Sequence, residues 1–135
     1  MAKNTQGSKQ STPVWISSDV RKVPFITVDK QLRIYFNTEA QELIGAREVV
    51  IGYDHANKRM IIGNPRYVRP VNVKPHRIDR RGYTSARPFL RELGISELTE
   101  PLKYEYVGKD HTVDGALAFQ LIGDDKAGRD GGRAL

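Results

Sequence analysis

Basic side chains are concentrated in the middle of the sequence, where they suit the chemistry of phosphate groups. Residues 66 to 91 include eight basic residues and a single acid, Asp79, and seven of the eight are arginines. The planar guanidinium forms paired hydrogen bonds with phosphate oxygens and with guanine edges. Each neutralised phosphate also releases counterions, so binding of this kind weakens as salt rises. The candidate nucleic-acid contacts in this stretch are Arg66, Arg69, Lys74, Arg77, Arg80, Arg81 and Arg87.

Aromatic rings are interleaved with these cations. Tyr67, His76 and Tyr83 could stack on bases or hydrogen-bond phosphates, and the net charge of +6 favours polyanionic partners. Residues 92 to 135, in contrast, include nine acids and five bases. Two interpretations therefore stay open: a surface for nucleic acid, or a solvated edge whose arginines pair with the acidic C-terminal part.

Residue types for enzyme chemistry are sparse. The absence of cysteine excludes thiolate metal sites and a cysteine nucleophile. His55, His76 and His111 lie in polar stretches, and only His111 has carboxylates nearby, at Asp110 and Asp114. That arrangement is typical of a solvated loop, and no phosphate-binding glycine motif occurs. We expect a binding protein that is not an enzyme and that has no cofactor and no metal.

Length and composition predict one small domain, or two very small units with a common core. The chain has 135 residues, of which 39% are apolar, and it has no apolar run of about 18 residues. This favours a soluble, cytoplasmic protein without membrane contact. Polar residues 1–13 and 123–135 predict disordered tails on either side of a compact basic domain at 14–122. The single tryptophan, Trp15, is expected in the core or as a lid over it.

Short apolar stretches rich in β-branched and aromatic residues predict a mainly β fold, that is, a β-rich α+β class. Residues 67–73 include a proline and are expected to form an extended connector or an edge strand. The other expected strands are 25–28, 32–36, 48–53, 59–62, 103–107 and 116–122.

Two short amphipathic stretches predict the helices, near 37–45 and 85–94. Asn37 or Thr38 is expected to cap the first, and Ser85 the second. Each stretch ends at a glycine, which suits the left-handed residue that terminates many helices. Helices of this length are unstable in isolation, so each must pack on a sheet.

The two helices lie in similar contexts, which suggests an internal repeat. Aligning Asn37 with Ser85 places Tyr35 on Tyr83 and gives a repeat of about 48 residues. The alternative is a chance likeness, since strand–helix–hairpin units are common. The expected divisions are unit one at about 25–65, a linker at 66–79, and unit two at about 80–122.

The first unit has a recognisable order of short motifs. ITVDKQLRIYFNTEAQELIG is followed by EVVIGYD and KRMIIGNP: a strand, a basic turn, a strand, a polar cap, a short helix and a strand pair ending near proline. This order resembles the AbrB/MazE-type swapped-hairpin domain. Leu32 replaces the turn glycine of that family, Asn37 its cap proline, and Ala46-Arg47 its glycine–aspartate step. The second unit fits the pattern more loosely, through RGYTS at 81–85 and Leu93-Gly94.

The resemblance implies a swapped-hairpin barrel, built from two β-α-β-hairpin units, that binds double-stranded DNA. In that family two chains normally interleave their hairpins, so tandem units in one chain imply a barrel completed alone, with a homodimer left open. Carried over by position, the implied contacts are Lys30 and Arg33 in unit one, and Arg80 and Arg81 in unit two.

The function implied is that of a transcriptional regulator or nucleoid-type protein of the AbrB-like class. One alternative is a protein-interaction module, an inhibitor or adaptor that docks on a larger complex through its basic strip. Another is an RNA-binding accessory protein, which would prefer single-stranded or A-form competitors.

Overall fold

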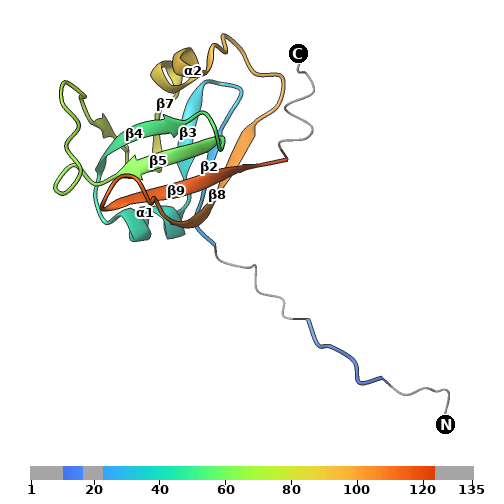
Figure 1. Cartoon of the computed structure of the whole chain (residues 1–135). Helices are drawn as coiled ribbons and strands as arrows, with labels where there is room; N and C mark the ends of the chain where they lie inside the picture. Colours follow the sequence, from blue (N-terminus) through green and yellow to red (C-terminus); the bar gives the residue numbers. More distant parts are fainter. Residues whose placement is uncertain (1–10, 17–22, 124–135) are drawn as a thin grey trace.

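The computed structural model describes residues 11–16 and 23–123 and is mainly β (Figure 1). The chain runs strand, strand, helix, strand, strand, and then repeats this order. The first five elements are β2 (Phe25–Val28), β3 (Arg33–Phe36), α1 (Thr38–Ile44), β4 (Glu48–Asp54) and β5 (Arg59–Gly63). The next five are β6 (His76–Arg77), β7 (Tyr83–Ser85), α2 (Arg87–Leu93), β8 (Leu102–Lys109) and β9 (Ala116–Ile122).

The predicted β-rich class and both predicted short helices are confirmed. β6 lies inside the segment that was expected to be a linker, so the second unit starts before residue 80. A strand of two residues is too short to show an alternating pattern in the sequence.

The strands form one nearly closed, barrel-like sheet in the order β6-β4-β5-β9-β8-β2-β3-β7. All neighbouring pairs are antiparallel. The hairpin β4–β5 of the first unit lies between β6 and β9 of the second. Reciprocally, the hairpin β8–β9 lies between β5 and β2 of the first unit. The two units have therefore exchanged hairpins within one chain, as expected for a swapped-hairpin barrel.

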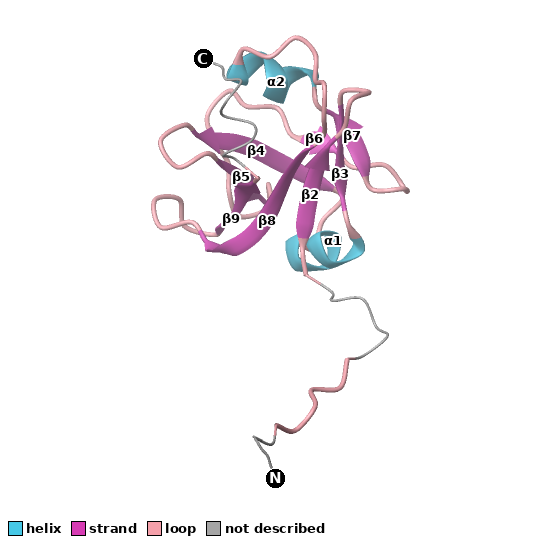
Figure 2. Ribbon diagram, turned by 90° about the vertical axis from the view of Figure 1, so that its right-hand side faces the viewer, coloured by secondary structure: helices cyan, strands magenta, loops and turns pink. Residues whose placement is uncertain are grey.

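The strand registers reveal an internal two-fold relation. β3 and β7 pair around Ile34↔Thr84, and β5 and β9 pair around Ile61↔Ala118. In Figure 2 these two strand pairs lie on opposite sides of the barrel. Two reciprocal hydrogen bonds obey the same relation, from Phe36 N–H to Gly82 O at 2.8 Å and from Ala86 N–H to Leu32 O at 2.9 Å.

This relation corrects the repeat alignment expected from the sequence. Tyr35 and Tyr83 are cross-strand partners rather than equivalent residues. The equivalent positions are Asp29 with Asp79 and Leu32 with Gly82, because they make matching turn hydrogen bonds. The shared tyrosine at 35 and 83 favours an offset of about 48 residues, whereas the equivalent turn aspartates, Asp29 and Asp79, are 50 residues apart.

Alternate strand residues fill the interior, since side chains on a strand point to opposite faces. β2 and β3 both alternate between partly exposed and buried positions. Both helices add side chains to the same cluster, which explains how such short helices are held. The largest fully buried side chains include Tyr104, Phe36, Phe119, Ile26, Ile34 and Met60.

The helix caps differ between the units. The Asn37 side chain accepts the Ala40 N–H at 2.9 Å, so the predicted cap of α1 is correct. The predicted cap of α2 is wrong: Ser85 ends β7, and the capping position belongs to Ala86, which makes no side-chain cap bond.

The apolar residues near the start of the chain lie outside the core. Val14, Trp15 and Ile16 are 86%, 88% and 92% exposed. The expectation that Trp15 is a core or lid residue is therefore wrong, because other aromatic rings fill the barrel. Residues 11–13 have no regular secondary structure, whereas 1–10 and 124–135, where most of the predicted tails fall, lie outside the described residues.

Candidate nucleic-acid interface

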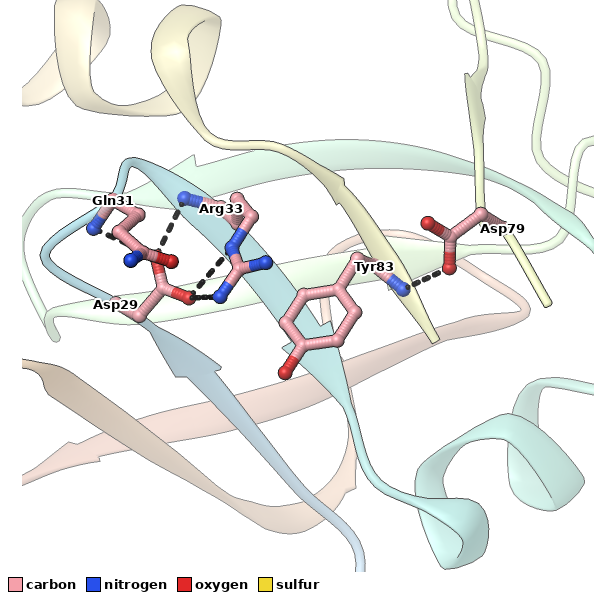
Figure 3. Close-up of polar contacts among 5 residues, drawn as sticks. All are labelled: Asp29, Gln31, Arg33, Asp79 and Tyr83. Carbon is pink, nitrogen blue, oxygen red and sulfur yellow. Dashed lines mark hydrogen bonds and ion pairs between the residues drawn. The ribbon is translucent and has the colours of Figure 1, made fainter. Parts of the chain in front are cut away.

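Two equivalent turns flank the paired strands β3 and β7, and each is organised by an aspartate. Asp29 Oδ1 accepts the N–H groups of Gln31 and Arg33, both at 3.0 Å. Asp79 Oδ1 accepts those of Arg81 and Tyr83, both at 2.9 Å. Figure 3 shows the two carboxylates on either side of the strand pair. The turns are consequently held in the same shape, and their side chains project from a rigid base.

The fourth residue of each turn has a left-handed backbone, with φ of 62° at Leu32 and 94° at Gly82. A Cβ at Gly82 would lie 2.7 Å from Phe36 O and 2.6 Å from Gln41 Nε2, so the second turn requires glycine. Leu32 adopts the strained conformation instead and packs against the core. The departure from the family's turn glycine therefore leaves the turn shape intact.

The negative charge of Asp79 is stabilised by the turn itself. Hydrogen bonds from the backbone amides, that of Tyr83 foremost and that of Arg81 next, lower the pKa of Asp79 below its ordinary value. The carboxylate faces backbone N–H groups and lies close enough to Arg81 for a Coulombic contribution of the same sign.

Arg33 and Arg81, which are far apart in the sequence, meet around one ring. The guanidinium carbon of Arg33 lies 4.3 Å from the centroid of the Tyr83 ring, and that of Arg81 lies 5.3 Å from it. The rings of Tyr35 and Tyr83 are 5.0 Å apart. These four side chains form the arginine–tyrosine cluster on the outer face of β3 and β7. Stacking of this kind orders a guanidinium while leaving its N–H groups available.

Arg33 is also paired with an acid. Its Nη2 lies 2.9 Å from Asp29 Oδ2, and its Nε donates to the same oxygen at 2.9 Å. The equivalent position in the second turn is Tyr83, so Asp79 has no such arginine. The two turns have the same balance of one acid and two bases, and they differ in that Arg33 is held in an ion pair with its turn aspartate.

The other predicted residues fall into three places. Lys30 and Arg80 directly follow the two turn aspartates and are exposed, and Arg87 is exposed at the start of α2. Arg77 lies on β6, in register with Glu48. Arg66, Arg69 and Lys74 lie in the loop between β5 and β6, which precedes the second turn in the chain.

Sequence reasoning missed Arg47. Its Nη2 donates to Asp79 O at 2.6 Å and its Nη1 to Gln41 Oε1 at 3.0 Å, so it links the second turn to α1. The available signal was its position directly after the helix-ending glycine and alanine, where the resembled family has a different pair.

The expected aromatic neighbours differ in accessibility. Tyr67 is 69% exposed, whereas Tyr83 lies under the two guanidinium groups. Burial lowers the pKa of His76 below its ordinary value, which keeps the ring neutral over more of the acidic range. His76 therefore adds little positive charge to this surface near neutral pH.

Three of the nine acids after residue 91, Asp124, Asp125 and Asp130, lie outside the described residues. Among residues 23–123, the ion pairs Arg33–Asp29 and His55–Glu92 join no arginine of residues 66–91 to an acid of the C-terminal part. Over the same residues, no group of three or more histidines and acids is placed to hold a metal ion. The described helices are all too short and polar to cross a membrane.

No protein-family model, curated protein or solved structure matches this chain. Support for a function of this chain therefore comes from the exchanged hairpins, the paired turns and the arginine–tyrosine cluster.

Proposed function

We propose that this protein binds double-stranded DNA through the outer face of β3 and β7, as a transcriptional regulator or nucleoid-type protein of the AbrB-like class rather than as an enzyme. The observation that supports this most directly is the arginine–tyrosine cluster between two equivalent basic turns. The hairpin exchange also agrees with what the resemblance to the AbrB/MazE-type domain implies. A cytoplasmic location is part of the same proposal.

The geometry suits a duplex in two respects. The two turns are related by an internal two-fold axis. The two antiparallel strands of a DNA duplex are also related by two-fold axes, so each turn can contact one strand in the same way. The Tyr83 ring also orders Arg33 and Arg81 before any ligand arrives, so less side-chain entropy is lost on binding. Lys30, Arg80 and Arg87 then extend the positive surface around the cluster.

The test is fluorescence polarisation with random duplex DNA over a salt series. Arg81→Ala should weaken binding to every sequence and reduce the log–log salt slope by about one, because one phosphate contact is lost. Arg59→Gln is a matched control that also removes one charge. Arg59 lies on the opposite β5–β9 side, where its Nε donates to Gln120 Oε1 at 2.7 Å, a bond that glutamine can replace.

Three outcomes decide the proposal. An Arg81→Ala slope equal to that of the parent, with a normal fold, would contradict the assignment of this face. Stronger competition by A-form RNA than by duplex DNA would favour the RNA-binding alternative. Absence of duplex binding even at low salt would favour a protein-interaction module.

One observation supports that last candidate specifically. Val14, Trp15 and Ile16 form a run of exposed apolar residues near the start of the chain. Such a run suits insertion into an apolar groove of a partner protein. Trp15 is the single tryptophan, so its fluorescence would report that contact directly.

A further inference from the structure

The loop between β5 and β6, residues 64–75, projects from the side of the barrel, and we call it the basic arm (Figure 1). Its base is firmly attached. Asn64 O accepts the N–H groups of Tyr67 and Val68 at 2.9 and 2.8 Å. The Val68 side chain is buried against Val50, and it packs so closely on Gly63 that a Cβ there would lie 2.7 Å from Val68 Cβ.

The outer part of the basic arm is both apolar and cationic. Val71 is 85% exposed, and Asn72 beside it has φ of 60°, which reverses the chain at the tip. Arg66, Arg69 and Lys74 flank the tip, and residues 64–75 include no acid. Arg69 donates to Pro65 O at 3.1 Å and to Arg66 O at 3.3 Å, which stiffens the approach to the tip.

This combination suits a nucleic-acid groove. Many proteins that bend DNA place basic side chains on the phosphates and insert an apolar side chain between base pairs. The basic arm also leads through Arg77 on β6 directly into the turn that presents Arg80 and Arg81. A membrane surface fits less well, because Val71, the less exposed Val73 and Tyr67 together offer little apolar area to bury.

We propose that the basic arm is a second DNA-binding element, which inserts Val71 between base pairs and bends the duplex held by the Arg80–Arg81 turn. This rests on the proposed DNA-binding function. Among the described residues, the arm adjoins the second of the two equivalent turns, the one that contains Arg80 and Arg81.

The experiment uses duplex DNA with 2-aminopurine in place of adenine, whose fluorescence rises when a base pair is unstacked. The full chain should brighten this probe on binding. Val71→Ser should lose most of that signal and about fivefold in affinity, because apolar contact is lost. Its salt slope should equal the parent's, since no charge changes. Val71 is almost fully exposed, so the substitution leaves the fold intact.

The matched control is Val113→Ser, which changes another exposed loop valine, between β8 and β9. It should behave as the parent does in both measurements. If Val71→Ser brightens the probe and binds as the parent does, while Arg81→Ala still flattens the salt slope, the arm is not a wedge and the DNA-binding function stands. If the parent fails to bind duplex at low salt, both proposals fall. Val71-dependent binding to phosphatidylserine vesicles, without probe brightening, would instead make the arm a membrane contact and overturn the inference.

Discussion

Asp29 and Asp79 have the same structural role and different electrostatic surroundings. Each accepts two backbone N–H groups and so shapes its turn. Asp29 additionally pairs with Arg33, while the equivalent Tyr83 cannot form an ion pair. The Asp29 carboxylate therefore offsets part of the positive charge of Arg33, whereas the residue equivalent to Arg33 in the second turn is an uncharged tyrosine.

Asp29→Asn should strengthen binding to duplex DNA. Asparagine can still accept the two turn amides through its oxygen, but it no longer neutralises Arg33. We expect affinity at low salt to rise about threefold or more, and the salt slope to steepen by about one. The pair is partly exposed, so the free energy of unfolding should fall by less than about 1 kcal/mol.

Asp54→Asn provides a control with the same change in net charge. Asp54 is the last residue of β4, where it accepts hydrogen bonds from Asn57 in the turn that leads to β5. If both variants strengthen binding equally, the effect comes from net charge alone and Arg33 is not a local contact.

At the scale of elements, the helices are short and depend on their ends and on the sheet. Asn37 is buried; it accepts N–H groups from Ala40 and from Phe25, and donates to Val23 O at 2.8 Å. One side chain therefore caps α1 and holds the start of β2. α2 lacks an equivalent cap, and its second residue is Pro88, which needs no N–H partner in the first turn.

Glycines with a left-handed backbone should differ sharply in their tolerance of a side chain. Gly82→Ala should lower the free energy of unfolding by about 3 kcal/mol, from backbone strain and from contact with Phe36 O. Gly45→Ala should cost only about 1 kcal/mol, because its φ is also positive while nothing lies within 4 Å of an added Cβ. Urea denaturation of both variants measures this difference, and equal costs would contradict the close packing at the second turn.

At the scale of the whole molecule, one chain contains both of the units that exchange hairpins to form the barrel. The β4–β5 hairpin of the first unit and the β8–β9 hairpin of the second unit each lie between strands of the other unit. The two hairpins also pair with each other, through β5 and β9 along Arg59–Gly63. The pairing that would otherwise join two chains is thereby satisfied internally.

We therefore predict a monomer that binds duplex DNA with one chain per site. Light scattering after size exclusion should give the mass of a single chain across a wide concentration range. A stable dimer in the absence of DNA would show that a further surface, outside the exchanged hairpins, joins two copies.

Much of the fold could be predicted from the sequence because its signals are local. Alternating apolar residues marked the strands, and the glycines after Ile44 and Leu93 marked the helix ends. Position along the chain also indicated both basic turns. These features depend on neighbouring residues, so a single sequence contains them.

The remaining features depend on contacts between distant segments. The cross-strand register of Tyr35 with Tyr83 decided that they are partners, and it brought Arg33 and Arg81 to one ring. Trp15 is exposed because other side chains already fill the barrel, which its apolar character could not reveal. Local pattern thus determined the elements and their order, while pairing between residues far apart in the chain decided the repeat register, the contents of the core and the geometry of the charged face.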